Sequence, residues 1–574
     1  MQKKSITITP NELKNGKLPS GYDEVIFKLS DGNWTKNITL PLQPDNNNRV
    51  IIRSSAKFTA VLDVTPVDVP LNTLDITTGY EYKFVYSQAL EMWVISGDSM
   101  SYFTPNNNGP VIPEKPAFFV FYTIADADWV PEIFLPAKAD NGSYIIVRSR
   151  AAYSSKVSTK NMLFASTTQI KKNDEYTFKF LSNFGGWVID SAPVRTLRAD
   201  SIDFQIPSLT SQHTQVEFSN GNWIEAIKLP AVAGDRDKVS LTSSANYTTT
   251  IDSSNVNMPG MMKLHTGERY DFFYIAENKQ WQLMKYPDSI YYAKDIQNGN
   301  IMPLIRPRTI IKVGDSNWQP VLKLPLGQQY GSRVIFQSSA TYPFQVLYDD
   351  KNYSVTQGEI VAFKVDEDTF WQKETITLNL LIVYSDKAAD KLGEHVIRNR
   401  LIEAFNLTNE ALENSGANFR FRLVGLKQII AKKNWKTLSN VISELRDDPT
   451  VQGWRRDLKA CGVYYEGTED GCGMAYVKAD SHSMIASGSI NYGTTVMRHE
   501  LGHNMGLKHA GESKSYNQGY GKINTIMGGN VIPYYSTPQR YTPDYGIRMG
   551  IRDGSGSPRN YRHKLKGGDS ENGI

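Results

Sequence analysis

The sequence contains very little cysteine and no long apolar run. Cys461 and Cys472 are its 2 cysteines, and they can form a disulfide or remain thiols. No cysteine precedes position 461, so no upstream segment of this chain can supply a thiolate. No apolar stretch is long enough to span a bilayer, and no apolar segment follows the lysines near the start. The sequence predicts neither a transmembrane segment nor a visible secretory signal.

An excess of charge of one sign is also missing. The net charge is +4 with 21% charged residues, which gives no reason to propose nucleic acid as a partner. At 574 residues the chain is too long for one core and predicts three to five domains. Three origins stay open: a mature chain with a new initiator Met, export without a signal peptide, or a cytoplasmic protein. We expect a secreted or exported protein.

Four copies of one module account for the first 370 residues. A tryptophan recurs at intervals of 94 or 95 residues, and a Leu-Pro pair follows each one at the same offset. A second tryptophan closes each unit. The first tryptophans are Trp34, Trp129, Trp223 and Trp318, and the second are Trp93, Trp187, Trp281 and Trp371. A period of this length predicts independent tandem domains rather than a solenoid.

Each module reads as a series of short strands. Segments such as NRVIIRSS and YEYKFVY alternate β-branched and aromatic residues between clusters of Asn, Gly, Asp and Pro. This pattern predicts antiparallel strands about every 8 to 12 residues, and hence a small β-sandwich. We place the modules at residues 1–103, 104–198, 199–294 and 295–373.

The repeated tryptophans have two interpretations. A tryptophan that keeps its place in every copy is a natural core anchor, because large aromatic side chains dominate burial energetics. Alternatively, loops such as DGNW and DSNW display the ring as a platform that stacks on sugars or docks onto a surface. Composition does not separate the two.

The stretch TTVMRHELGHNMGLKH, residues 494–509, places polar residues at metal-binding spacing. An α-helix turns once every 3.6 residues, so His499 and His503 project from one face and can reach a single ion. Glu500 lies beside them, where its carboxylate can hold a water molecule and take its proton.

A third histidine completes the pattern outside the helix. Gly506 permits the positive φ angle that ends a helix, and the chain can then bend back to bring His509 to the site. Three neutral imidazoles with one position left for water are the arrangement of a catalytic Zn²⁺ site. A bare HExxH arises by chance in many chains, but this pattern gathers three of the 8 histidines within eleven residues.

HELGHNMGLKH resembles the extended signature HExxHxxGxxH of the metzincin metallopeptidases, and TIMG at residues 525–528 resembles their Met-turn. Within that group the wording is most similar to the reprolysin-like branch and its bacterial relatives of the peptidyl-Asp metalloendopeptidase type. The resemblance implies that the three histidines bind Zn²⁺, that Glu500 is the general base, and that Met527 forms an apolar floor under the histidines.

The resemblance also indicates where a substrate binds. In metzincins the edge strand before the active-site helix lies antiparallel to the bound peptide, and residues 471–479 occupy that place here. The segment IPYYSTPQRYTPDYG, residues 532–546 and called the wall segment below, forms the opposite side in relatives. Candidate contacts are Gly473, Met474 and Ala475 on the strand and Ile532, Pro533 and Tyr534 on the wall segment. Tyr535 is also close enough in sequence to line the cleft.

Residues 374–556 follow the order of elements in these relatives. ITLNLLIVYS predicts a buried strand of a mixed sheet, and a helix follows, with Asp386 as its N-cap and Gly416 as its stop. A strand at residues 419–429, a short helix and two strands that open with a cysteine come next. The predicted fold class is multidomain: four tandem all-β, sandwich-like modules, an α+β metzincin-like zinc protease domain, and a flexible tail at residues 557–574.

The predicted function is a zinc-dependent endopeptidase. It hydrolyses protein or glycoprotein substrates through a zinc-activated water, and residues 1–370 target it to a cell-surface or glycan ligand. Two alternatives stay open. The modules can be an adhesin or toxin-like array with the protease as an accessory, or an inhibitory pro-region removed by cleavage near residues 372–375. The regular repetition favours targeting, because inhibition of one cleft needs one plug rather than four.

Overall fold

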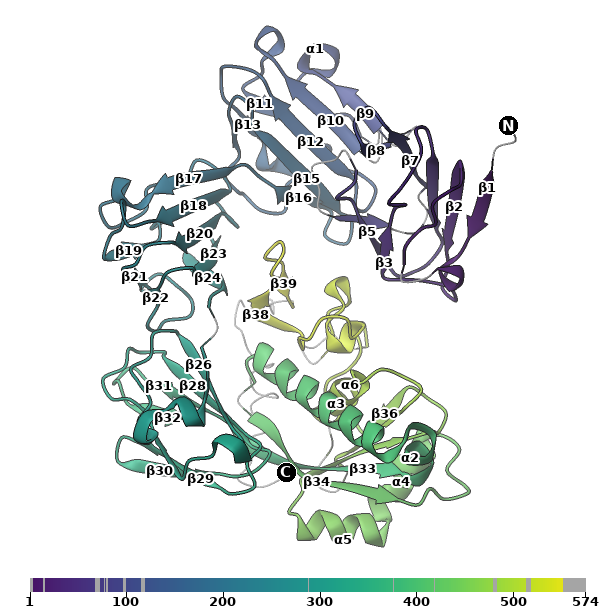
Figure 1. Cartoon of the computed structure of the whole chain (residues 1–574), viewed down its shortest axis with the longest axis vertical. Coiled ribbons are helices and arrows are strands. Elements are labelled where there is room, and N and C mark those ends of the chain that lie inside the picture. Colours follow the sequence, from purple (N-terminus) through teal and green to yellow (C-terminus); the bar gives the residue numbers. More distant parts are fainter. Residues whose placement is uncertain are drawn as a thin grey trace. The chain divides into compact units, whose positions relative to one another are not determined.

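The structure is a computed structural model, shown in Figure 1. The residues it describes are 4–13, 16–67, 73–76, 78, 81–96, 100–114, 119–287, 289–374, 376–417, 419–477, 479, 483–512 and 518–550. The chain divides into two compact units, one with residues 1–218, 229–242 and 271–281, the other with residues 219–228, 243–270 and those from Gln282 onward. The predicted tail lies outside the described residues. In the part of the chain that is described, no helix is long and apolar enough to cross a membrane.

Each of the four modules contains a five-stranded and a three-stranded sheet. In spatial order, the five-stranded sheet of module 1 contains β1 (Ser5–Ile8), β2 (Glu24–Leu29), β4 (Arg49–Ser54), β7 (Glu81–Ser87) and β8 (Met92–Ile95), and that of module 2 contains β9 (Met100–Phe103), β10 (Phe119–Ile124), β12 (Tyr144–Ser149), β15 (Glu175–Leu181) and β16 (Gly186–Ser191). The sheet of module 3 contains β17 (Val194–Arg198), β18 (His213–Phe218), β20 (Lys238–Ser243), β23 (Arg269–Ile275) and β24 (Gln280–Lys285). The sheet of module 4 contains β25 (Ile290–Tyr292), β26 (Arg308–Val313), β28 (Arg333–Ser338), β31 (Ile360–Val365) and β32 (Trp371–Lys373).

The three-stranded sheets follow the same plan. They are β3 (Asn37–Thr39), β5 (Ala60–Asp63) and β6 (Thr73–Ile76); β11 (Glu132–Ile133), β13 (Ser155–Val157) and β14 (Gln169–Ile170); β19 (Ala226–Lys228), β21 (Thr249–Asp252) and β22 (Lys263–Leu264); and β27 (Val321–Lys323), β29 (Phe344–Tyr348) and β30 (Lys351–Val355). The strands β9, β17 and β25 pair within the following module, although the boundaries expected from the sequence leave them in the preceding one.

The prediction of antiparallel strands is wrong for two of the four pairings in the five-stranded sheets of modules 1, 2 and 4. In modules 1, 2 and 4 the first three strands in spatial order are parallel, and the remaining pairings are antiparallel. The reason is visible in the order of elements. Between β2 and β4 the chain places β3 in the other sheet, and this crossover returns it in the same direction.

The second tryptophan of each module is a core residue. Trp93, Trp187, Trp281 and Trp371 are at most 1% exposed. Each indole N–H donates to the proline carbonyl of the Leu-Pro pair, at 3.3 Å to Pro41 and at 2.8 Å to Pro136, Pro230 and Pro325. A buried donor is costly without a partner, so this bond explains why the tryptophan and the Leu-Pro pair recur together. The core-anchor interpretation is confirmed for this set.

The first tryptophan of each module is only half-buried and packs against an exposed aromatic ring. The pairs are Trp34 with Phe58, Trp129 with Tyr153, Trp223 with Tyr247 and Trp318 with Tyr342, with ring centroids 5.8, 5.8, 5.3 and 6.1 Å apart. The partner rings are 59% to 68% exposed. A side-chain oxygen three residues before each tryptophan accepts the backbone N–H just before the partner ring, from Asp31, Asp126, Asn220 and Asp315. These rings lie at the surface rather than in the core, and we call them the surface aromatic pairs. Their role as a platform for sugars or a surface stays a prediction.

The peptidase domain has one five-stranded sheet in the order β34 (Phe419–Ile429), β33 (Ile376–Ser385), β35 (Gly462–Gly467), β37 (Ile485–Ser489) and β36 (Gly473–Ala475). All neighbours are parallel except β36, which runs antiparallel to β37 at the edge. The helices are α2 (Asp386–Leu392), α3 (Glu394–Asn414), α4 (Leu438–Asp447), α5 (Pro449–Asp457) and α6 (Val496–Asn504), and β38 (Thr537–Tyr541) pairs with β39 (Arg548–Met549).

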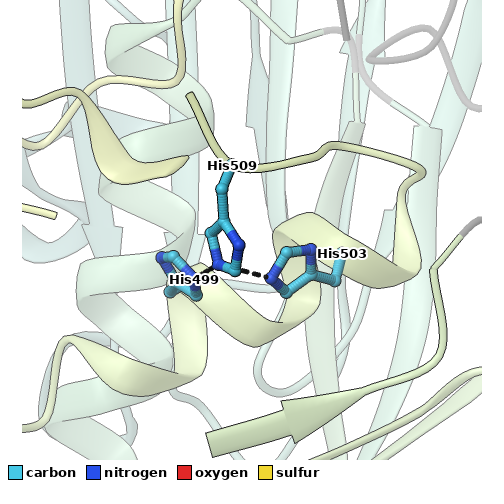
Figure 2. Close-up of side chains that lie close together, drawn as sticks. All are labelled: His499, His503 and His509. Atoms are coloured by element: carbon cyan, nitrogen blue, oxygen red, sulfur yellow. Dashed lines mark hydrogen bonds between the residues drawn. The ribbon is translucent and has the colours of Figure 1, made fainter. Parts of the chain in front are cut away.

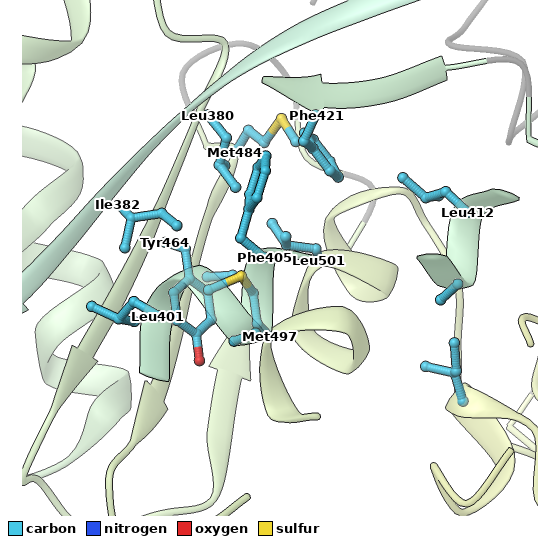
Figure 3. Close-up of a cluster of buried hydrophobic side chains, with 14 of the residues drawn as sticks. Leu380, Ile382, Leu401, Phe405, Leu412, Phe421, Tyr464, Met484, Met497 and Leu501 are labelled. Carbon is cyan, nitrogen blue, oxygen red and sulfur yellow. The ribbon is translucent and has the colours of Figure 1, made fainter. Parts of the chain in front are cut away.

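Apolar side chains alternate along β33 and supply two cores. Leu380 and Ile382 join the core that contains α3 and α6, part of which Figure 3 shows. Leu381 and Val383 join the core of α4 and α5. Helices therefore cover both faces of the sheet, and the predicted mixed, buried sheet is confirmed.

Three local predictions differ from the structure. Ser385, not Asp386, caps α2, because its hydroxyl accepts the N–H of Ala388. The predicted single helix is divided at Gly393, where φ is 90°. Helix α5 was not predicted, although Asp448 caps it with two N–H bonds and Pro449 opens it.

The two cysteines are free thiols. Cys461 precedes β35, and its thiol donates to the carbonyl of Asn379 at 2.9 Å, while Cys472 is exposed beside β36. Burial raises the pKa of the Cys461 thiol to about 11. The disulfide left open by the sequence is therefore not formed.

Replacement of a second tryptophan tests the module core. We expect Trp187→Ala to destabilise module 2 by about 3–5 kcal/mol, because it empties a core position and leaves the Pro136 carbonyl without its donor. Tyr153→Ala removes an exposed ring from the same module and should cost within about 0.5 kcal/mol. Hydrogen exchange of module 2 peptides in the full chain measures both. Equal protection in the two variants would contradict the core assignment.

Candidate metal centre

Helix α6 and the turn after it bring three histidines to one point (Figure 2). His499 and His503 lie on α6, the helix reaches its C-cap at Met505, and Gly506 follows with φ of 88°. The Nε2 atom of His509 lies 3.1 Å from that of His499 and 3.2 Å from that of His503. The turn predicted at Gly506 and the return of His509 are present.

The other ring nitrogen of each histidine has a partner that fixes its proton. Nδ1 of His499 lies 2.8 Å from the carbonyl of Ile526, and Nδ1 of His503 lies 2.8 Å from that of Leu507. Nδ1 of His509 lies 2.8 Å from a carboxylate oxygen of Glu512. Because these acceptors take an N–H, all three Nε2 atoms present lone pairs to the same point.

This arrangement fits a metal ion. Three lone pairs at such short separations repel one another unless a cation lies between them. Zn–N bonds of about 2.0–2.1 Å put two ligands of a tetrahedron about 3.3–3.4 Å apart, close to the separations found here. Burial lowers the pKa of His499 to about 4 and also lowers that of His503, which keeps both rings in the neutral form that binds metals.

Glu500 lies directly against the edge strand. Its side chain is buried, and this burial raises its pKa to about 8. A Cβ atom built on Gly473 would lie 2.3 Å from Oε1 of Glu500 and 2.6 Å from its Cγ. A side chain at position 473 would therefore displace the carboxylate. Glycine here leaves the space that Glu500 occupies.

The Met-turn packs under α6. Met527 is 1% exposed, and its sulfur would lie 2.6 Å from a Cβ atom on Gly502, so the turn and the helix are in direct contact. Thr525 stabilises the turn, because its hydroxyl accepts the N–H of Tyr520 at 2.7 Å. The same turn supplies the Ile526 carbonyl to His499.

The other candidate residues lie in two places. Met474 is 39% exposed on β36, and Ala475 follows it as the last residue of that strand. The predicted edge strand is much shorter than residues 471–479, and part of that range, Lys478, lies outside the described residues. Ile532, Pro533 and Tyr534 are half-buried on the wall segment.

Tyr535 does not line a cleft. It is fully buried, and its hydroxyl donates to the carbonyl of Arg498 at 2.6 Å, so this expectation is wrong. Arg498 was missed by the sequence analysis; its Nε donates to Asn530 at 2.8 Å, just before the wall segment. Glu512 was also missed, and its spacing of three residues from His509 is the one sequence signal that could have shown it.

Family comparisons match the two parts of the chain separately. The model described as "Metalloprotease StcE, beta-sandwich domain" matches residues 23–97, 117–191, 211–285 and 306–375. The model of "Metallo-peptidase family M12", a reprolysin-type model, matches residues 374–543. The M12 match contains β33, α6 and all three histidines.

The proteins similar to this chain include a bacterial peptidase and a solved structure. A peptidyl-Asp metalloendopeptidase of Pseudomonas aeruginosa is 26% identical over 197 residues, which cover 30% of this chain and 33% of the relative. The chain thus matches about one third of the length of that relative. A solved structure described as that of a chaperone-substrate complex is 33% identical, with a TM-score of 0.80, and the match covers 95% of this chain and 96% of the other.

Two histidines on a helix and a third after it, in an α+β domain matched by the M12 model, define a metallopeptidase of the reprolysin-like type with a metal-binding histidine triad. The StcE model matches just over half of the residues, and the solved relative is similar over nearly the whole length. The chain therefore belongs to the metalloproteases that carry StcE β-sandwich domains ahead of an M12 peptidase domain.

The contact between Gly473 and Glu500 generates a prediction. We expect Gly473→Ala to lower peptide hydrolysis on the order of 100-fold, because the new methyl group pushes the Glu500 carboxylate out of position. The matched control is Gly493→Ala, where a Cβ atom has only Thr495 within 4 Å, at 3.7 Å. Turnover and metal content are measured together. Loss of metal in Gly473→Ala, or wild-type turnover, would contradict this role.

Proposed function

We propose that this metallopeptidase is a zinc-dependent endopeptidase with His499, His503 and His509 as its metal ligands and Glu500 as its general base. The observation that carries the proposal is the convergence of three Nε2 lone pairs beside a buried carboxylate. The donor set consists of imidazoles only, which suits zinc and leaves a position for water.

Zinc supplies Lewis-acid chemistry when bound, since it polarises a scissile carbonyl and makes a water molecule acidic near neutral pH. Glu500 takes the proton of the attacking water and delivers it to the leaving amine. The raised pKa of Glu500 means that its carboxylate holds the proton well once it has taken it. Before that step the carboxylate must be ionised, and a nearby dication favours the ionised form. Base and metal therefore depend on each other.

The edge strand supplies the site for the substrate backbone. Among the described residues β36 pairs with β37 alone, so its other side can bind an extended peptide by β-augmentation. Gly473, Met474 and Ala475 contact the substrate there in this proposal. Because β36 is also the strand that touches Glu500, a peptide bound along it lies next to the base. Ile532, Pro533 and Tyr534 contact the residue that follows the scissile bond.

Variants of the base and of one ligand test the proposal. We expect Glu500→Gln to keep one zinc per chain and to lose about 10²–10⁴-fold in turnover, the range that general acid–base catalysis supplies. His503→Ala should lose both metal and activity. Cleavage of a peptide library read by mass spectrometry, with and without chelator, and metal analysis of each variant provide the measurements.

An exposed histidine serves as the control for these variants. His395 lies on α3 and contacts Asn399 at 2.9 Å, so His395→Ala should leave both zinc and turnover unchanged. Full activity of Glu500→Gln would show that the base is misassigned. Zinc retained by His503→Ala would show that His503 is misassigned as a metal ligand.

The surface aromatic pairs support a targeting role for residues 1–370. Four copies of an equivalent ring pair are displayed on loops, and in each copy an Asp or Asn side chain makes the corresponding bond. This repetition is more than the module core needs. Aromatic faces stack on sugar rings and dock onto surfaces. We propose that the modules bind a cell-surface glycan and bring an exported peptidase to its protein or glycoprotein substrates.

Removal of the exposed rings tests targeting separately from catalysis. A variant with Phe58→Ala, Tyr153→Ala, Tyr247→Ala and Tyr342→Ala should bind glycan arrays and cell surfaces at least tenfold more weakly than wild type, while its hydrolysis of short peptides is unchanged. Wild-type binding by this variant would reject the aromatic pairs as the contact. Equal loss of peptide hydrolysis would indicate a structural effect instead.

A further inference from the structure

A cluster of charged side chains joins module 4 to the end of α3. Glu413, in the last turn of α3, accepts both Nη groups of Arg333 on β28, the second at 3.2 Å. From the peptidase domain Arg420 donates to the same carboxylate, and Arg308 on β26 lies 3.9 Å from it. Glu374, just after β32, accepts the Nε group of Arg333. Arg333 of module 4 therefore binds two carboxylates: Glu413 in the peptidase domain and Glu374 just after the last strand of module 4.

This cluster is withdrawn from water. The side chains of Arg333, Glu413 and Arg420 are 18%, 14% and 1% exposed. Burial opposes ionisation of Glu413, but the Arg333 and Arg420 guanidiniums hold its pKa well below the ordinary value. A carboxylate that binds a guanidinium through both oxygens has a fixed direction as well as a fixed position. The last turn of α3 is thereby tied to module 4.

A second contact makes the junction specific. Arg422 on β34 donates to the hydroxyl of Thr356 at 2.7 Å, in the turn before β31. In the same turn, a Cβ atom on Gly358 would lie 3.0 Å from the carbonyl of Leu423. Module 4 therefore touches the peptidase sheet as well as α3, and the two contacts together resist rotation.

The residues that follow Glu413 hold the wall segment. The Asn414 side chain donates to the carbonyl of Pro533 at 3.2 Å, and the hydroxyl of Ser415 accepts the N–H of Tyr535 at 2.8 Å. Tyr535 in turn donates to the carbonyl of Arg498, next to the first histidine. The wall segment thus has one anchor on α6 and one on the last turn of α3.

We propose that Arg333 of module 4 is a positioning residue for the peptidase: through Glu413 and the end of α3 it fixes the wall segment that contacts the substrate residue after the scissile bond. Module 4 is then a permanent part of the peptidase rather than a separate domain that could be removed without effect. The inference deepens the proposed function and rests on it for the identity of the wall.

The sequence of the modules agrees with a dedicated role for module 4. Arg308 and Arg333 are register partners on β26 and β28. The corresponding register partners are Glu24 with Arg49 in module 1 and an aromatic pair in module 2. Among these three modules, two adjacent arginines occur only in the one that meets Glu413.

The experiment compares full-length wild type, Arg333→Met, Arg333→Lys and Arg306→Met. Arg306 is the matched control: it is also buried in the chain just before β26, with a side chain 3% exposed, but its guanidinium binds Glu268 and the carbonyls of Lys263 and Ile305, all outside the peptidase domain. Each protein is tested for kcat and KM on a good peptide, for cleavage-site preference on a library, and for hydrogen exchange at residues 533–537.

We expect Arg333→Met to raise KM about three- to tenfold with kcat within twofold, to broaden the preference after the scissile bond, and to speed exchange at residues 533–537. Arg333→Lys should restore much of each property, and Arg306→Met should change none. A wild-type preference and exchange in Arg333→Met would overturn the inference, as would equal effects of Arg306→Met. If wild type cleaves no peptide, the proposed function fails, while the exchange measurement still decides whether Arg333 holds the wall segment.

Discussion

The peptidase domain depends on one electrostatic constraint: three imidazole lone pairs face one another and repel unless a positive charge lies between them. Carbonyls and a carboxylate take the Nδ1 protons and leave the Nε2 atoms facing one another at 3.1 and 3.2 Å. Every surrounding element serves that convergence: α6 supplies two rings, the bend at Gly506 returns the third, and the Met-turn supplies a carbonyl. A metal ion converts this repulsion into attraction, so binding and local order are coupled.

Much of the site was predictable because it is local. The spacing of His499, Glu500 and His503 needs only the pitch of a helix, and Gly506 needs only its missing Cβ to end that helix. What the sequence did not show arises from contacts between distant segments. The fit of Gly473 against Glu500, the bond of Tyr535 to Arg498 and the partner role of Glu512 depend on how strands and turns meet in space. A short polar helix such as α5 was missed because its apolar positions are few, although its cap residues were present.

In the modules, too, some features were predictable from the sequence and others were not. The period, the strand content and the four copies follow from recurring residues. The parallel pairings do not, since alternation of residues indicates a strand without its direction. The two sets of tryptophans also looked alike in sequence. The second tryptophans donate to a Leu-Pro carbonyl, whereas the first pack against an aromatic ring on a neighbouring loop. Only the fold shows this difference.

The separation of the tryptophans into two environments has a spectroscopic consequence. Eight of the 10 tryptophans of the chain lie in the modules, four in the cores and four in the surface aromatic pairs. Intrinsic fluorescence of the native protein is therefore mostly a signal from the array rather than from the peptidase. Its accessible half, open to a quencher such as acrylamide, is the half that a bound glycan would shield. The chain thus contains its own optical probe of module occupancy, independent of whether the metal site turns over.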